Sequence, residues 1–188
     1  MSKLSDEILV SKSIENIDYF GELVERYERK LLFYILRISS LNEMEAEEVI
    51  QDIFLKAWKN LHGFDPDLKF STWIYRIAHN ETISTFRKIQ SRGQDKKVDI
   101  EPEYLESFAS DLDFLKDLDQ DFKASQIQTI LNQMRPKYRE VLILKYFEDQ
   151  SYESIGDILK KPSGTVATLI SRAKKEFESI VVKNAVNL

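Results

Sequence analysis

Apolar residues at helical spacing, with few residues that break helices, constrain the fold of this chain most. Between Asn16 and Ile38 the apolar side chains recur every three or four residues over about five turns. A second such segment begins at Asn42, where Glu45 completes a capping-box pattern, and it stops at Gly63. Only five Gly and four Pro occur among 188 residues, so long helices with few turns are expected. No strand-like alternation appears in the N-terminal half of the chain, which predicts a compact helical bundle there.

Charge and composition divide the chain into three parts. In the first part, a third helix is expected from about Ser71 to Ser91, after the loop that follows Gly63. Residues 93–123 are polar and carry 4 basic and 10 acidic groups, whereas residues 1–92 carry 13 and 15, and residues 124–188 carry 10 and 7. We therefore expect an all-α protein of two small helical domains, an N-terminal helical bundle and a C-terminal four-helix domain with a helix-turn-helix. An acidic flexible linker, residues 93–123, would join residues 1–92 to residues 124–188.

Several classes of protein are excluded by the composition. The chain has no cysteine, which excludes disulfides and thiolate metal sites. The N-terminus lacks the apolar core of a signal peptide, and the apolar run from Leu31 to Leu36 is far shorter than the roughly 20 residues that span a bilayer. A cytoplasmic protein without membrane insertion is expected. Neither His62 nor His79 has the Glu-x-x-His spacing of a bundle metal site, and catalytic residues, metals and other cofactors are not expected.

A helix-turn-helix pattern lies in the C-terminal region, on the only clearly basic segment of the chain. Its first helix starts at Ser151 and presents Ile155 and Leu159 on its inner face. After a break at residues 160–162, the second helix has an apolar stripe of Val166, Ile170, Ala173 and Phe177. The second helix of such a pair can enter a DNA major groove, although a simple helical hairpin would show much the same pattern.

The third predicted helix carries amide, guanidinium and aromatic groups on two neighbouring faces. One face holds Arg76, Asn80, Ile83 and Arg87, and the adjacent face holds Tyr75, His79, Thr82 and Phe86. Such faces suit unpaired bases, because rings and guanidinium planes stack on bases and amides pair with base edges. A surface helix with half-buried aromatic residues is the alternative for this segment alone.

Three segments, taken together, resemble the extracytoplasmic-function (ECF) group of bacterial RNA polymerase sigma factors. EVIQDIFLKAWKNL is similar to the core-polymerase-binding helix, and FSTWIYRIAHN to the helix that melts and recognises the −10 element. MRPKYREVLILKYFEDQSYESIGDILKKPSGTVATLISRAKKEF is similar to the −35-binding domain. The resemblance covers residues 16–92 and 124–178. It implies a sigma factor that directs promoter-specific initiation, with residues 1–92 as sigma region 2 and residues 124–188 as sigma region 4.

The resemblance also implies partners and residue roles. Core RNA polymerase would be bound through its largest-subunit coiled coil and its flap, promoter DNA would be bound at two elements, and an anti-sigma factor would be a further partner. The implied contacts to core polymerase are Gln51, Asp52, Leu55 and Trp58. The implied contacts to −10 DNA are Phe64, Trp73, Arg76, His79, Asn80 and Arg87. The implied contacts to −35 DNA are Ser163, Thr165, Ala167, Thr168, Ser171, Arg172 and Lys175.

Three features depart from the family pattern. Residues 167–169 are Ala-Thr-Leu where family members commonly have basic residues, and each missing phosphate contact weakens DNA binding. Lys160 occupies a turn position that is often Gly, and Ser84 a position that is often Asp. Two alternatives therefore stay open: a helix-turn-helix regulator that binds duplex DNA without core polymerase, and a sigma-like interaction module with weak −35 binding.

Overall fold

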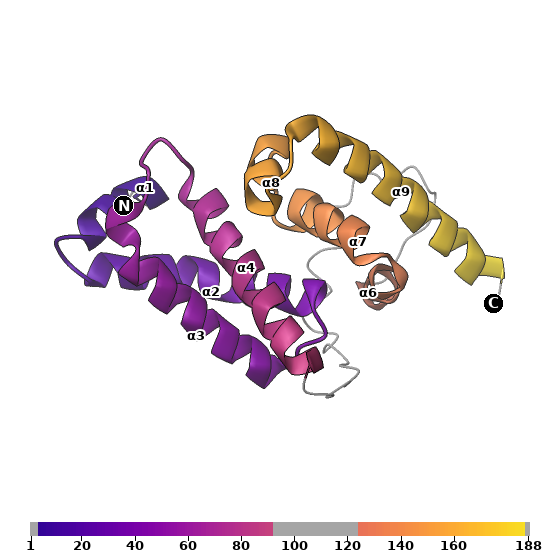
Figure 1. The fold of residues 1–188 in the computed structure, drawn as a ribbon, viewed down its shortest axis with the longest axis horizontal. Coiled ribbons are helices and arrows are strands. Elements are labelled where there is room, and N and C mark those ends of the chain that lie inside the picture. The colour runs from indigo at the N-terminus through magenta and orange to yellow at the C-terminus, as the bar shows by residue number, and fades with distance from the viewer. Residues whose placement is uncertain (1–3, 92–123, 187–188) are drawn as a thin grey trace. The chain divides into compact units, whose positions relative to one another are not determined.

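Every regular element of the protein is helical in the residues that its computed structural model describes, 4–91 and 124–186 (Figure 1). The first range contains α1 (Asp6–Ser13), α2 (Asp18–Ile38), α3 (Glu43–Lys59), the 3-10 helix η1 (Leu61–Gly63) and α4 (Phe70–Ser91). The second range contains α6 (Ala124–Gln133), α7 (Pro136–Leu142), the π-helical turn η4 (Ile143–Phe147), α8 (Tyr152–Leu159) and α9 (Ser163–Val186). The expected all-α fold is confirmed. The expected linker, residues 93–123, lies outside the described residues.

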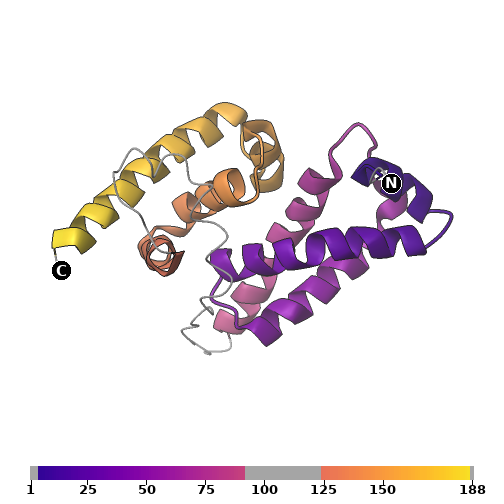
Figure 2. The same cartoon turned by 180° about the vertical axis from the view of Figure 1, so that it is seen from behind.

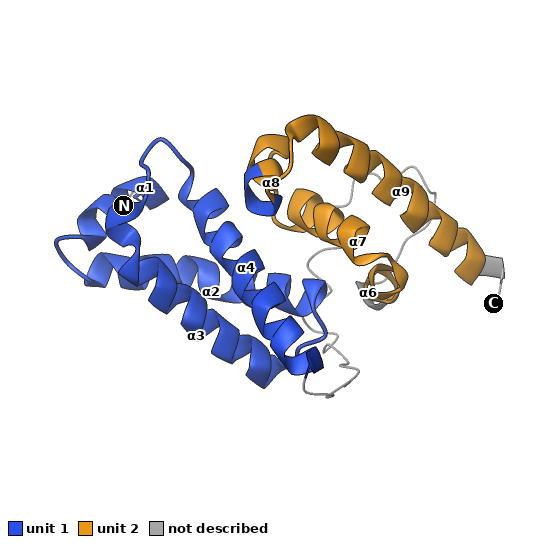
Figure 3. Cartoon of the chain, viewed as in Figure 1, with its two compact units in different colours: residues 1–98, 157–159 blue, residues 99–156, 160–188 orange. Residues whose placement is uncertain are grey.

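The chain forms two compact units, residues 1–98 with 157–159 and residues 99–156 with 160–188 (Figure 3). In the first unit α3 packs against both α2 and α4, and α1 packs against α2 and α4. Seen from behind, α2 lies across α3 and α4 (Figure 2). Tyr34 and Tyr75 meet edge to face in this core, with 5.2 Å between ring centroids, and both are buried. These contacts hold the third predicted helix, α4, against the two helices before it.

The predicted capping box at the start of α3 is present. The Glu45 amide donates to Asn42 Oδ1 at 2.9 Å, and the Asn42 amide donates to Glu45 Oε2 at 2.9 Å. Two amides that have no partner within the helix are thereby satisfied, which fixes where α3 begins. The orientation of every α3 side chain follows from this start.

Helix α1 was not predicted from the sequence. Its apolar residues Ile8, Leu9 and Val10 are consecutive, so they give no helical period. Ser5 caps the helix by accepting from the Ile8 amide at 3.3 Å. Leu9 and Val10 are buried, whereas Ile8 is 46% exposed. Packing against α2 and α4 therefore stabilises a helix that is too short to be stable by itself.

The second unit packs α9 against both α7 and α6. Apolar residues of α6 and of the turn after it are buried: Ile127, Ile130, Leu131 and Met134. After α7 the helix changes to a π turn, in which the Glu148 amide donates to the Ile143 carbonyl at 3.1 Å. That turn buries Ile143 and Leu144 and leaves Lys145 half-buried. The spacing of buried residues changes here because the hydrogen bonds of a π turn join residues five apart.

Candidate polymerase and promoter interface

The outer face of α3 presents three of the four predicted polymerase contacts. Gln51 and Asp52 are exposed, and Leu55 is 50% exposed. Trp58 is half-buried, because its ring packs against Phe20 with 5.2 Å between centroids. The inner face of α3 is buried at Val49, Ile50, Ile53, Phe54 and Ala57. The outer face is therefore free for a partner while the inner face holds the fold.

Met44 is a candidate contact that the sequence reasoning missed. Its side chain is 73% exposed on the first turn of α3. It precedes Leu55 by eleven residues, close to three helical turns, so the two apolar side chains share a face with Gln51. The sequence did carry a sign of this contact, because Met44 is an apolar residue that falls outside the core-facing positions of α3. An exposed Met and Leu on one face are typical of a contact surface rather than of a solvated helix.

Four predicted −10 residues lie on α4 where solvent reaches them. Asn80 and Arg87 are exposed, and Arg76 and His79 are half-buried. Arg76, Asn80 and Arg87 follow one another at spacings of four and seven, so they form one face of the helix, as predicted. This face combines two guanidiniums with an amide, groups that can stack on and pair with unpaired bases.

The other two predicted −10 residues, Phe64 and Trp73, are buried. Their rings meet edge to face at 5.4 Å between centroids. Phe70 contacts both rings, at 6.0 Å from Phe64 and 5.8 Å from Trp73. Trp73 is only 7% exposed, so a base could stack on it only after the cluster opened. In this structure the two rings hold the loop in place and are not presented to solvent, and their direct contact with DNA stays a prediction.

The loop between η1 and α4 is fixed at both ends by this aromatic cluster. Phe64 anchors its start and Phe70 its end, while Asp65, Asp67 and Lys69 are exposed. Inside the loop, the Asp67 amide donates to Asp65 Oδ1 at 3.0 Å, and the Leu68 amide donates to the Asp65 carbonyl at 3.0 Å. The exposed tip is therefore a short structured turn beside the first turns of α4.

An ion pair joins the two helices that carry the polymerase face and the −10 face. Lys56 Nζ of α3 lies 2.5 Å from Glu81 Oε1 of α4. The Glu81 side chain is 18% exposed and that of Lys56 is 53% exposed, so solvent screens the pair in part. The pair helps to fix the register between the two helices that carry the two candidate surfaces.

The predicted −35 residues lie along the outer face of α9. Those that are exposed are Ser163, Thr165, Thr168, Ser171, Arg172 and Lys175, and Ala167 is half-buried. The opposite face is buried as predicted at Val166, Ile170, Ala173 and Phe177. Thr168 Oγ1 donates to the Gly164 carbonyl at 3.0 Å, so this hydroxyl can offer an incoming group only its acceptor lone pairs. The first basic residues along this face of α9 are Arg172 and Lys175, more than two turns into the helix.

The turn before α9 is unusually tight. Lys160 has a left-handed backbone, φ 53° and ψ 50°, and its amide donates to the Gly156 carbonyl. The Lys161 amide also donates to that carbonyl, at 2.8 Å. A Cβ added to Gly156 would lie 2.6 Å from the Lys161 carbonyl oxygen, a distance that real side chains do not adopt. Gly adopts this left-handed conformation most readily, so Lys160 occupies a position that suits Gly.

A charged contact fixes α9 to the start of α7. The Arg135 amide donates to Glu176 Oε1 at 2.8 Å, and Arg135 Nε donates to Glu176 Oε2 at 2.7 Å. Burial alone would raise the pKa of the Glu176 carboxyl, but these side-chain and backbone hydrogen bonds from Arg135 outweigh it and lower that pKa. The contact joins residues 41 positions apart and ties the middle of α9 to the residue before α7.

The described residues contain no group of three or more His, Asp or Glu side chains that could hold a metal ion. Within the same ranges, no helix combines the length and the apolar character needed to span a bilayer.

Comparisons with known proteins identify the family of the chain. The family model of sigma-70 region 2 matches residues 23–92, and that of sigma-70 region 4 matches residues 124–177. The ECF RNA polymerase sigma factor SigW of Bacillus subtilis is 34% identical over 181 residues, which cover 90% of this chain and 95% of SigW. The ECF RNA polymerase sigma-E factor of Haemophilus influenzae is 30% identical over 186 residues, 94% of this chain and 95% of that protein.

Solved structures share the fold. CnrH, in complex with the cytosolic domain of CnrY, superposes with a TM-score of 0.69 at 23% identity and covers 95% of this chain and 97% of CnrH. The sigma factor RpoE of Bartonella quintana, in complex with the anti-sigma factor NepR, gives a TM-score of 0.68 at 23% identity, over 86% of this chain and 96% of RpoE. The chain belongs to the ECF group of the sigma-70 family, and it is a sigma factor that directs RNA polymerase to specific promoters.

Proposed function

We propose that this sigma factor uses three outward helix faces for three separate tasks. The outer face of α3, with Met44, Gln51 and Leu55, binds core polymerase. The exposed face of α4, with the loop before it, holds unpaired bases of the −10 element. The outer face of α9 lies in the major groove of the −35 element, with the acidic residues 93–123 between the two DNA-binding units. These assignments place residues 1–92 as region 2 and residues 124–188 as region 4.

One observation carries the proposal. The candidate residues at the centre of each face, Leu55 on α3, Asn80 on α4 and Arg172 on α9, are exposed, whereas the opposite faces of the same helices are buried. Each partner can therefore bind without unfolding the helix that it contacts. On α9 the basic contacts begin at Arg172, so we expect weaker phosphate binding than in a relative with basic residues at 167–169.

Run-off transcription tests the proposal as a whole. Core RNA polymerase is supplied with genomic fragments from the source organism, with and without the protein, and the new transcripts are sequenced. We expect the added transcripts to start downstream of a shared motif of two blocks. If the start sites share only one block, or if the same sites are bound without polymerase, the three-face assignment is wrong.

A pair of substitutions tests the α3 face. Leu55→Ala is expected to weaken binding to core polymerase by about tenfold, because an exposed aliphatic side chain buried at an interface contributes about 1 to 2 kcal/mol. Ile17→Ala is the matched control, because Ile17 is 61% exposed in the same unit but lies outside α3. Competition binding to fluorescent holoenzyme measures both. Equal affinities for the two variants would remove Leu55 from the interface.

We further propose that the chain catalyses no reaction itself, acts in the cytoplasm where the polymerase is, and is inhibited by an anti-sigma factor. In the two structures above, RpoE is in complex with the anti-sigma factor NepR, and CnrH is in complex with the cytosolic domain of CnrY. Co-purification of the tagged chain from its source organism, with and without inducing stress, tests the last point. A stoichiometric partner that leaves when core polymerase binds would support it, and recovery of polymerase alone under every condition would contradict it.

A further inference from the structure

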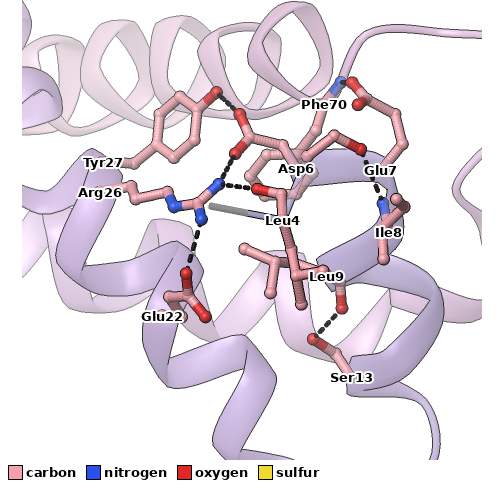
Figure 4. Close-up of polar contacts among 11 residues, drawn as sticks. Leu4, Asp6, Glu7, Ile8, Leu9, Ser13, Glu22, Arg26, Tyr27 and Phe70 are labelled. Carbon is pink, nitrogen blue, oxygen red and sulfur yellow. Dashed lines mark hydrogen bonds and ion pairs between the residues drawn. The ribbon is translucent and has the colours of Figure 1, made fainter. Parts of the chain in front are cut away.

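Two adjacent carboxylates of the N-terminal helix α1 bind two different helices (Figure 4). Asp6 Oδ1 accepts from Arg26 Nη1 of α2 at 2.7 Å, and Asp6 Oδ2 accepts from the Tyr27 hydroxyl. Glu7 Oε1 accepts from the backbone amide of Phe70, the first residue of α4, at 3.3 Å. Neighbouring side chains of α1 therefore connect the start of α4 to the middle of α2.

The connection to α2 is strong. Arg26 Nη1 also donates to the Leu4 carbonyl at 2.8 Å, so the guanidinium holds both the side chain of Asp6 and the backbone before α1. Burial, together with the hydrogen bond to Asp6, raises the pKa of the Tyr27 phenol, which therefore stays protonated and remains a donor. Leu9 is fully buried beneath these contacts. The position of α1 on α2 is thus fixed by charge, hydrogen bonding and packing together.

The connection to α4 is at the point where the −10 loop ends. Phe70 is fully buried, and its amide is one of the four at a helix start that have no acceptor within the helix. The Glu7 carboxylate satisfies that amide and lies at the positive end of the α4 dipole. The Tyr27 ring contacts the Phe70 ring edge to face, with 5.3 Å between centroids. Tyr27 therefore holds α1 through its hydroxyl and α4 through its ring.

We propose that α1 is a positioning element for the −10 surface: Asp6 fixes α1 to α2, and Glu7 fixes the start of α4. The loop that precedes Phe70 and the face that begins at Arg76 then keep one orientation towards the melted strand. Glu7 touches no DNA in this proposal and acts through Phe70. The inference rests on the −10 role proposed above for α4.

The test uses the full-length chain in holoenzyme, on a promoter found by run-off transcription. Glu7→Ala removes the acceptor, whereas Glu7→Gln keeps an acceptor oxygen and loses only the charge. Glu15→Ala is the matched control, since Glu15 is an exposed acidic residue just after α1. Three quantities are measured for each variant: hydrogen exchange of the backbone from Phe64 to Arg76, affinity for core polymerase, and opening of the −10 element reported by a fluorescent base.

We expect Glu7→Ala to speed exchange at Phe70 and to reduce open complex by about three- to tenfold, the effect of losing one hydrogen bond. Affinity for core polymerase should stay as in the wild type, and Glu7→Gln should restore most of the opening. Equal opening for Glu7→Ala and Glu15→Ala would overturn the proposal, and so would a loss of core affinity that matches the loss of opening.

A parallel Asn80→Ala variant separates the positioning role of α1 from the −10 role of α4. If Asn80→Ala impairs opening and Glu7→Ala does not, the role of α1 is wrong and the −10 role of α4 stands. If neither variant impairs opening, the −10 role itself is wrong, and unchanged exchange at Phe70 in Glu7→Ala would also reject the coupling of α1 to α4.

Discussion

Burial distinguishes residues that can contact DNA from residues that hold the contact surface in place. Asn80 and Trp73 are both candidates for the −10 element, two turns apart on α4. Asn80 is exposed, whereas Trp73 is 7% exposed and packs against Phe64 and Phe70. Substitutions at the two positions should therefore have different consequences.

Asn80→Ala is expected to impair promoter opening and to leave stability within about 0.5 kcal/mol of the wild type, since the residue is on the surface. Trp73→Ala should lower the free energy of unfolding by about 3 to 5 kcal/mol, because it leaves a cavity in the aromatic cluster. Urea denaturation and fluorescence of a base in the −10 element measure the two effects. Normal opening with Asn80→Ala would show that its amide does not bind a base.

The turn before α9 leaves no room for a side chain at Gly156. Gly156→Ala places a Cβ 2.6 Å from the Lys161 carbonyl oxygen, and the turn must move to accept it. We expect a loss of about 1 to 3 kcal/mol in the free energy of unfolding, as for other overpacked sites. Gly164→Ala is the control, because nothing lies within 4 Å of its added Cβ. Since Ala favours a helix, that variant should be no less stable than the wild type in the same urea titration.

At the scale of elements, α9 depends on a contact outside the helix-turn-helix. Glu176 accepts hydrogen bonds from the Arg135 amide and side chain at the start of α7. The folded-state pKa of Glu176 is lowered, so its contribution to stability is complete above the unfolded pKa of about 4.3 and is lost as the pH falls through the folded value.

Glu176→Gln should therefore lower the melting temperature at pH 7. The difference from the wild type should shrink as the pH falls below about 4.3 and vanish below the lowered folded-state pKa, where the folded wild-type carboxyl becomes protonated. Glu178→Gln, two residues further along α9 and exposed, should follow the wild type at every pH. Calorimetry over a pH series gives the comparison. A difference that is constant with pH would show that the Glu176 charge does not stabilise α9.

At the scale of the whole molecule, charge is divided among three parts of the chain. Residues 93–123 carry 10 acidic and 4 basic groups, whereas residues 124–188 carry 7 acidic and 10 basic. This acidic segment joins the parts of the chain that carry the −10 and −35 surfaces, and we propose that it occupies the positively charged path that RNA later takes through the polymerase, because opposite charges attract.

Replacing the ten acidic residues of 93–123 by their amides should alter early transcription more than closed-complex formation. The physical reason is that the charge would act inside the polymerase, after promoter binding. The ratio of abortive to full-length RNA and the footprint of the closed complex measure the two stages. An unchanged abortive yield, with normal initiation, would rule out a role for this charge.

Local patterns in the sequence determined much of this structure. The helical fold, the capping box at Asn42 and the exposed face of α4 that begins at Arg76 were predictable, because helix period and caps depend on residues within one or two turns. The neighbouring face, also predicted to suit unpaired bases, is partly core, since Tyr75 and Thr82 are buried. Departures from a family pattern were also visible, and the Lys160 position proved to be a left-handed turn.

Tertiary contacts decided the rest. Helix α1 has no periodic signal of its own, and its carboxylate Glu7 binds the amide of Phe70, 63 residues further along the chain. The resemblance implied contacts to −10 DNA for Phe64 and Trp73, but their spacing did not reveal that both rings pack against Phe70 in a buried cluster. The physical reason is the same in each case: a hydrogen bond or a buried ring depends on partners that folding brings together, and spacing along the sequence does not contain that information.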